Sequence, residues 1–538
     1  MRCRQIIPVA LATAACLIAN PPTSPAQTTA PAKAAGQSQT PAVPATAGAG
    51  ALGRACDTLG DLLPPDPNHP VPRRRLPIDD STKSQILHSG LPCAESVDTN
   101  GPDPTGLRNL QHGFDFVSWR TFIALNSPAD GTNLDIEHSQ SDTPTQWEDM
   151  KNFKQLLDVM LPPGQTPKWP DNEQAREDEK VRLMPAACVP QYKTGMMVIK
   201  MIEETFNQPF KTGPLIDQDG HYALFDILMN KAMFHYIERH QLFSKAGQRE
   251  QIRAGLAIDF PSGQNPNPAK QVVGDAGAIM IKVSWKILNP DEIRSRKFHM
   301  VYALVQLPQP SDPNVQPPCL PETLGLVGFH VVHKTLGRPQ WIWTSFEHVD
   351  NVPEQREVDA GPLPRRYSFF DHSCSADKCS PNQVPPWPWE PDPAGELKFH
   401  GSFNSQITRV TALMDATVEI NTAFQKLLNH TVWQNYMLIN TQWPSNFGCT
   451  NLPAKNVDPK MLFPNTDFQK LPDMTCAPAP TFLANSTLET YSQGDVPQAS
   501  SSCMACHGNA TDFQNAPADP NAAHFNQSDF TFMLEKAQ

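Results

Sequence analysis

The residues best suited to chemistry lie near the end of the chain, where Cys503, Cys506 and His507 form a C-x-x-C-H motif. Two thiols at this spacing lie about one turn apart and can form thioether bonds to the two vinyl groups of a haem. The imidazole that directly follows the second thiol can then bind the haem iron as its proximal ligand. The motif therefore predicts a single covalently attached haem c, held by Cys503 and Cys506 and ligated by His507.

Two other kinds of site use cysteines at this spacing. A redox-active dithiol is expected inside a thioredoxin-like βαβ unit, and no such pattern surrounds the motif. A zinc site needs further ligands, and His524 is the only histidine after His507. Haem attachment is favoured over both, and the motif resembles the haem-binding motif of c-type cytochromes. That resemblance covers the last few dozen residues of the chain.

The position of the motif departs from the plan of small c-type cytochromes, in which the chain after the motif wraps the haem. Only residues 508–538 follow His507, too few to bury a haem, so we expect this segment to dock on the large upstream domain. Met533 is the nearest downstream methionine and the candidate distal ligand of the iron. The other candidates are one downstream histidine and several upstream residues: His524, His330, His348, Met437, Met461 and Met474.

Composition limits the classes of partner. The chain has 538 residues and a formal net charge of −12, which argues against a nucleic-acid partner. A redox protein of this charge is expected to meet a partner protein with a basic surface, and the sequence does not identify that partner. Its 56 prolines and 18 % charged residues are typical of a folded protein with stiff, irregular surface loops.

The N-terminus is typical of an export signal. A basic start is followed by an apolar stretch, residues 6–18, that is too short to span a bilayer. We expect a signal peptide over residues 1–26, a disordered Ala/Pro-rich linker over 27–52 and a periplasmic or otherwise exported mature protein. Lipid anchoring at Cys16 is the less favoured alternative, because Thr13 is not the large apolar residue such sites prefer. No later segment predicts a transmembrane helix.

The remaining cysteines fit an exported chain. Once Cys3, Cys16, Cys503 and Cys506 are set aside, eight of the twelve cysteines remain, enough for four disulfides. Their pairing cannot be deduced from the sequence alone, and only the local pair Cys374–Cys379 is proposed.

Hydrophobic periodicity predicts an α+β fold over residues 53–495, with a central antiparallel sheet and flanking helices, and a haem-binding segment over 496–538 docked on it. Apolar residues alternate with polar ones over residues 279–287, and residues 299–307, 324–335 and 340–349 are further predicted strands. Helical spacing predicts helices over residues 111–125, 222–241, 406–429, 432–439 and 528–537.

A predicted hairpin joins strands 324–335 and 340–349 through a four-residue turn, 336–339. If Thr335 faces Gln340, alternation places His330 and Glu347 on one face and His333 and His348 on the other. A metal site at His330 and Glu347 is one interpretation. The sequence offers no third ligand, so the preferred interpretation is that these histidines are structural or face the haem.

Several blocks resemble segments of an uncharacterised group of large exported bacterial single-haem proteins: residues 116–122, the stretch from Gly328 to Asn351, and Glu489-Thr490-Tyr491. This resemblance implies no particular activity. The first hypothesis is therefore a periplasmic single-haem cytochrome-like protein that transfers electrons. The alternatives are a haem-dependent oxidoreductase with a substrate pocket in the large domain, and a haem-based binding or sensor protein.

Overall fold

The computed structural model of the protein describes residues 86–87, 91, 107–129, 136–200, 202–209, 212–264, 274–307, 318–335, 338–363, 365–374, 378–389, 397–399, 403, 405–444, 478–479, 484–493, 503–507, 510 and 528–538. All of them belong to a unit that spans Gly48–Gln538. The predicted signal peptide and linker, with Cys16, lie outside the described residues, as do His524, Met461 and Met474. Within the described ranges, no helix is both long enough and apolar enough to cross a membrane.

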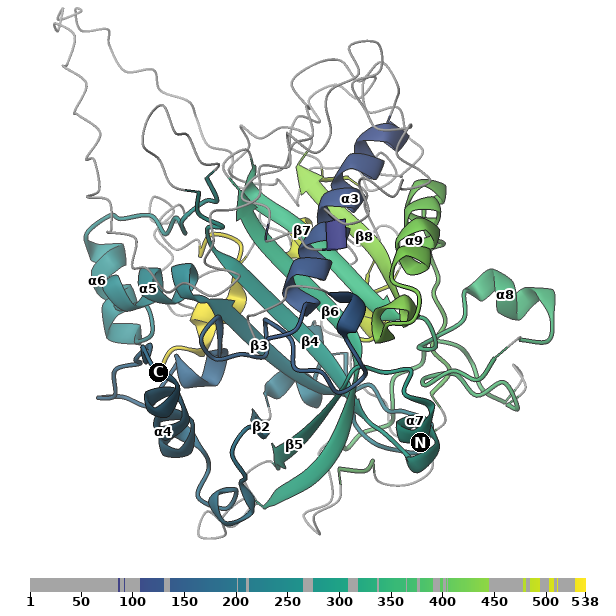
Figure 1. The fold of residues 1–538 in the computed structure, drawn as a ribbon, viewed down its shortest axis with the longest axis horizontal. Helices are drawn as coiled ribbons and strands as arrows, with labels where there is room; N and C mark the ends of the chain where they lie inside the picture. Colours follow the sequence, from purple (N-terminus) through teal and green to yellow (C-terminus); the bar gives the residue numbers. More distant parts are fainter. Residues whose placement is uncertain are drawn as a thin grey trace, which may run out of the picture. The chain divides into compact units, whose positions relative to one another are not determined.

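The fold is α+β, as the periodicity predicts, and is built on a nine-stranded sheet among the described residues (Figure 1). The main path is β1-β3-β4-β6-β7-β8-β9, and β2-β5 joins it through β6. Every pairing is antiparallel except that of β2 with β5. The strands are β1 (Phe153–Gln155), β2 (Met197–Lys200), β3 (Leu224–Asn230), β4 (Ile279–Ile287), β5 (Met300–Gln306), β6 (Cys319–Thr335), β7 (Arg338–His348), β8 (Tyr436–Pro444) and β9 (Pro478–Ala479).

Helices flank the sheet. The α-helices are α3 (Leu107–Asn126), α4 (Glu173–Leu183), α5 (Lys231–Arg239), α6 (Lys245–Arg253), α7 (Pro290–Ser295), α8 (Gln355–Ala360), α9 (Asp415–Leu427) and α10 (Cys503–His507). Short 3₁₀ turns are η3 (Ile136–His138), η4 (Leu156–Asp158), η5 (Val189–Gln191), η6 (Glu203–Thr205), η9 (Val432–Asn435), η12 (Thr490–Ser492) and η14 (Phe532–Lys536).

One face of the sheet packs against α3 and α9, which lie in front of it in Figure 1. Trp119 of α3 stacks on Phe424 of α9 with ring centroids 5.0 Å apart, and it meets Phe346 of β7 edge-on at 4.8 Å. The odd-numbered residues of β4, from Ile279 to Ile287, supply the sheet side of this core. Burial of these aromatic and branched side chains is the main stabilising contribution on this face.

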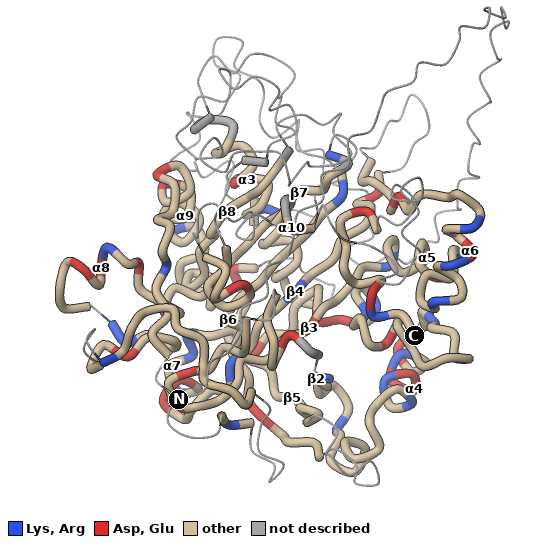
Figure 2. Tube along the Cα trace, turned by 180° about the vertical axis from the view of Figure 1, so that it is seen from behind, with Lys and Arg blue, Asp and Glu red and all other residues tan. Residues whose placement is uncertain are grey.

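The opposite face of the sheet is covered by the end of the chain. Met504 of α10 and Met533 of η14 share an apolar cluster with Met280, Val332 and Trp343 of the sheet. Figure 2, which views the molecule from behind, shows α10 over β7. Asp529 fastens this segment to β6, because its carboxylate accepts hydrogen bonds from Lys334 Nζ at 2.5 Å and from the Phe260 amide at 2.8 Å. The segment that carries the C-x-x-C-H motif therefore docks on the sheet.

The predicted helix over residues 222–241 is wrong in its first half. Residues Leu224–Asn230 form β3, which lies between β1 and β4, and α5 begins at Lys231. Apolar side chains line both faces of a strand in the middle of a sheet, so a short apolar run suits a helix and a buried strand equally. Asn230 marks the boundary, since its side chain accepts a hydrogen bond from the Met233 amide and caps α5.

Three other predicted helices differ from the structure. Residues 406–414 precede α9, which begins at Asp415. The predicted helix 432–439 is a single 3₁₀ turn followed by β8, where Tyr436 to Gln442 pair with β7. The predicted terminal helix 528–537 is reduced to the 3₁₀ turn η14. For residues 436–439, pairing with β7 outweighs local helical spacing.

The hairpin of β6 and β7 has the predicted register but a shorter turn. His330 pairs with Ser345 and His333 with Ile342, which corresponds to Thr335 facing Gln340. A shift between His333 and Thr335 then pairs Thr335 with Arg338, so the predicted four-residue turn is wrong.

Two disulfides occur among the described cysteines, Cys374–Cys379 as predicted and Cys188–Cys319. Cys56, Cys93, Cys449 and Cys476 lie outside the described residues.

Candidate functional site

A cavity of about 410 Å³ lies between the sheet and the C-terminal segment. Three neighbouring strands form its floor in successive cross-strand rows: Met280, Val332 and Trp343 in the first row, and Lys282, His330 and Ser345 in the second. All of these except Ser345 line the cavity, together with residues of the C-terminal segment: Cys503, Cys506, His507, Phe532 and Met533. Its volume lies within the range of about 300–1,000 Å³ that is typical of ligand and cofactor sites.

The three residues of the predicted haem motif come together at this cavity. Cys503, Cys506 and His507 form the single turn α10, and all three line the cavity wall. The two cysteines are not joined in a disulfide. Burial raises the pKa of both thiols, to about 12 for Cys506, and the charge of Glu489 raises them further. A redox-active dithiol needs a lowered thiol pKa, so this environment is unsuited to thioredoxin-like chemistry.

His507 is held by the last segment of the chain. Its Nδ1 lies 2.9 Å from the carbonyl oxygen of Phe530, which can only accept, so Nδ1 carries the proton. Burial lowers the pKa of His507 to about 4, and the ring is neutral at neutral pH. The lone pair of this tautomer lies on Nε2. The rings of Trp343 and Phe532, with centroids 4.4 and 5.0 Å away, fix the orientation of the imidazole.

The backbone that holds His507 is strained. Asp529 and Phe530 have φ angles of 51° and 66°, in the left-handed region that bulky residues rarely adopt. Residues in this conformation cost on the order of 1–3 kcal/mol each and cluster at functional sites. Here the two left-handed residues belong to the turn whose Phe530 carbonyl accepts the hydrogen bond from His507.

A second histidine also lines the cavity. His330 Nε2 lies 2.9 and 3.1 Å from the two carboxylate oxygens of Glu489. Burial alone would raise the pKa of Glu489, but the charges of His330 and Lys282 and the Asn485 amide together hold it below its ordinary value. Glu489 is therefore ionised at neutral pH and accepts the Nε2 proton of His330. The sequence did not predict that Glu489 lies at this cavity, although Glu489 belongs to the block Glu489-Thr490-Tyr491 noted in the sequence.

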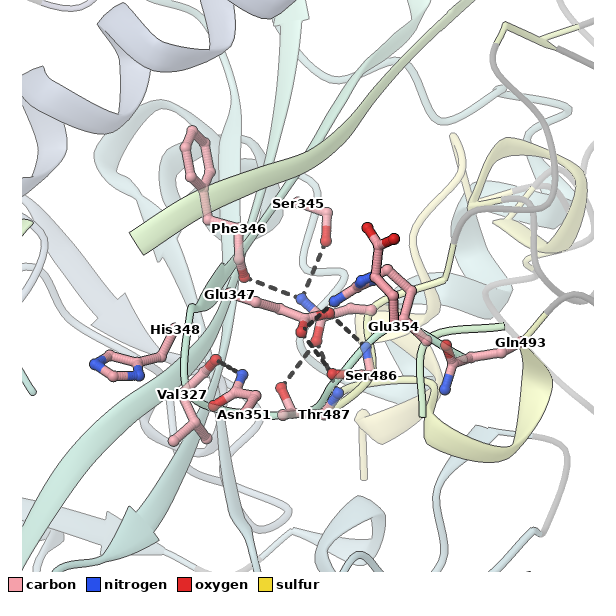
Figure 3. Close-up of polar contacts among 12 residues, drawn as sticks. Val327, Ser345, Phe346, Glu347, His348, Asn351, Glu354, Ser486, Thr487 and Gln493 are labelled. Carbon is pink, nitrogen blue, oxygen red and sulfur yellow. Dashed lines mark hydrogen bonds and ion pairs between the residues drawn. The ribbon is translucent and has the colours of Figure 1, made fainter. Parts of the chain in front are cut away.

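Glu489 is positioned by a buried polar network around Glu347 (Figure 3). Glu347 accepts hydrogen bonds of 2.5 Å from both the amide and the hydroxyl of Ser486, and one of 2.7 Å from Arg409. The Asn485 side chain donates to Ser345 and to the Phe346 carbonyl, and the Asn485 amide donates to Glu489 at 3.1 Å. Residues 485–489 are thereby fixed to β7.

Close packing completes this attachment at Gly328. A Cβ atom on Gly328 would collide with the hydroxyl oxygens of Ser284 and Thr487, which bond to each other at 2.7 Å. The glycine lets residues 485–489 approach the sheet, and a signal of this kind cannot be recognised from the sequence alone.

The metal interpretation of His330 and Glu347 gains no support from this geometry. The two residues share a face of the sheet, as the register predicts, but His330 bonds to Glu489 and Glu347 to Arg409. Among the described residues, no group of three or more His, Cys, Asp or Glu side chains could hold a bare metal ion. His333 and His348 lie on the other face, where they bond to the carbonyl oxygens of Ala276 and Lys297.

The candidate distal ligands are separated by the fold. Met533 and His330 line the cavity, whereas Met437 lies at a second cavity beside α9, and His348 stacks on Phe298. The residues present at the first cavity fit a haem. They are two neighbouring thiols, a neutral imidazole whose Nε2 lone pair receives no hydrogen bond from the described residues, and mainly apolar walls.

Comparison of the chain with family models, curated proteins and solved structures returned no match.

Proposed function

We propose that the chain is an exported single-haem c-type cytochrome-like protein that transfers electrons. The observation that carries this proposal is the placement of Cys503, Cys506 and His507, from one turn, on the wall of one cavity. When bound, the haem supplies an iron centre that gains and loses one electron.

The chain's own residues serve this function in distinct ways. Cys503 and Cys506 offer the two thiols for covalent attachment, and His507 offers Nε2 because Phe530 occupies Nδ1. Trp343, Phe532 and Met533 supply apolar surface that limits access of water, and water access is one of the factors that set the potential of a haem.

Export is supported by the disulfides. Cys188–Cys319 and Cys374–Cys379 both lie within the described residues, and disulfides persist mainly in oxidising compartments such as the periplasm. Covalent attachment of haem to C-x-x-C-H outside the bacterial cytoplasm agrees with the same location.

A second candidate is a haem-dependent oxidoreductase. Glu204, Glu535 and Lys536 also line the cavity, and their charged side chains could hold a polar substrate. This alternative requires an open coordination position on the iron.

Visible spectra of the exported protein, oxidised and reduced and with and without carbon monoxide, test the proposal. Electron transfer predicts a six-coordinate, low-spin haem that does not respond to carbon monoxide. A high-spin haem that binds carbon monoxide would instead favour the oxidoreductase or a gas-binding sensor.

A further inference from the structure

The tautomer of His330 is fixed by its partner. His330 Nε2 lies 2.9 and 3.1 Å from the two carboxylate oxygens of Glu489, and carboxylate oxygens accept hydrogen bonds, so Nε2 carries the proton of the bond between them. The described residues provide no hydrogen bond to His330 Nδ1, and the ring lines the cavity. In the neutral ring the lone pair therefore lies on Nδ1, the nitrogen left available to the cavity.

His507 has the complementary arrangement. Its Nδ1 donates to the Phe530 carbonyl, and its lone pair lies on Nε2. Two histidines from distant parts of the chain thus line one cavity. Each has one nitrogen bound by an acceptor, and the other nitrogen receives no hydrogen bond from the residues that the structure describes. This is the arrangement of metal-ligating histidines, which nearly always donate their second nitrogen to a carboxylate or a carbonyl.

We infer that His330 would bind the haem iron through Nδ1, in addition to Nε2 of His507. The inference rests on the proposed function and specifies its site: two histidines would hold the iron, which would leave no coordination position for a substrate or a gas.

His330 is better placed for this purpose than Met533. Met533 follows Phe530, whose carbonyl accepts the hydrogen bond from His507, and Phe532, whose ring packs against the imidazole. It also packs with Met504 of α10 in an apolar cluster. Its segment thus supports the proximal ligand. His330 comes from β6, a different element, and its carboxylate partner is anchored separately through residues 485–489.

Glu489 is then a positioning residue. By accepting the Nε2 proton, its carboxylate would make the imidazole a stronger electron donor to the iron and would favour the oxidised state. Lys282 pairs with His330 across the sheet, and its positive charge lowers the pKa of both Glu489 and His507.

The test is spectroscopic and uses the exported, haem-loaded protein. Near-infrared magnetic circular dichroism of the oxidised wild type should show His/His rather than His/Met ligation. His330→Ala should convert the haem to a high-spin form that binds carbon monoxide, and added imidazole should restore the low-spin spectrum. Met533→Leu should leave the spectrum unchanged. Glu489→Gln should remain low-spin with a more positive midpoint potential.

His235→Ala is the matched control, because His235 also pairs with a carboxylate, Glu238 at 3.0 Å, but at a partly exposed position on α5. It should retain the wild-type spectrum. The inference is overturned if His330→Ala stays low-spin, or if Met533→Leu rather than His330→Ala becomes high-spin. Covalent haem content, measured on each sample, separates the two proposals: haem present with a different ligand contradicts only this inference, and no haem contradicts both.

Discussion

The guanidinium of Arg409 donates a hydrogen bond of 2.7 Å to the carboxylate of Glu347, and neither side chain is more than 2 % exposed. The same carboxylate holds Ser486, in the turn that carries Glu489 to the cavity. A buried ion pair is costly to form, but removing one partner is costlier still, because it leaves an uncompensated charge.

Arg409→Met should therefore lower the free energy of unfolding by about 3–5 kcal/mol, measured by guanidinium denaturation. Arg253→Met is the control, because Arg253 pairs with Glu250 on the surface and both side chains are about 70 % exposed. That variant should change stability by less than about 0.5 kcal/mol. Equal losses in the two variants would show that the buried pair has no special importance.

Gly328→Ala tests the close approach of residues 485–489 to β6. Its new Cβ would meet the hydroxyls of Ser284 and Thr487, so we expect a loss of about 1–3 kcal/mol in unfolding free energy from overpacking. Gly325→Ala lies three residues away on the same strand, and there the Cβ meets the flexible end of Leu288. The smaller loss should belong to Gly325→Ala, and the reverse order would contradict the packing described.

His348 makes stability depend on pH. Burial lowers its pKa from 6.5 to about 4, and its Nδ1 accepts the Asp350 amide, a bond that protonation of Nδ1 would break. Because folding favours the neutral ring, its stabilising contribution is complete above pH 6.5 and is lost as the pH falls toward 4. This pKa shift corresponds to a loss of at most about 3 kcal/mol in the free energy of unfolding.

His348→Gln should therefore flatten the fall in unfolding free energy between pH 7 and pH 4, as measured by urea denaturation at several pH values. His235→Gln, at a partly exposed site, should keep the wild-type slope. An unchanged slope in His348→Gln would show that the ring is not held neutral by the fold.

The two disulfides should differ in their effect on stability. Cys188–Cys319 closes a separation of 131 residues and Cys374–Cys379 one of 5, so the unfolded chain loses more freedom through the first. On the chain-entropy model, Cys188→Ala/Cys319→Ala should cost about 3 kcal/mol more than Cys374→Ala/Cys379→Ala. Thermal or chemical denaturation of the two double variants measures this difference, and similar losses would contradict it.

Sequence patterns were informative where one physical signal dominated. Alternation over residues 279–287 predicted β4 with its observed bounds. The haem site predicted from the spacing of Cys503, Cys506 and His507 stays a prediction, and the three residues line one cavity. Sequence patterns failed where tertiary pairing decided the outcome. Leu224 and Phe225 of β3 and Tyr436 of β8 fit a helix until their neighbouring strands are known.

The other half of the site could not be predicted for a similar reason. Lys282, His330 and Glu489 come from β4, β6 and a turn far along the chain, and only sheet register and the Glu347 network bring them to one cavity. Cys188 and Cys319 are likewise joined by the pairing of β2 with β5 and of β5 with β6.

Covalent attachment of haem is the most direct test of the central claim. The chain would be exported from a bacterium that carries the haem c maturation machinery, and the denatured protein analysed by mass spectrometry and by haem staining of a denaturing gel. The account predicts a single haem that survives denaturation. It should be retained in Cys374→Ser/Cys379→Ser, which also lacks two cysteines, and lost in Cys503→Ser/Cys506→Ser. A wild-type protein without covalent haem, or a Cys503→Ser/Cys506→Ser variant that keeps it, would contradict the account.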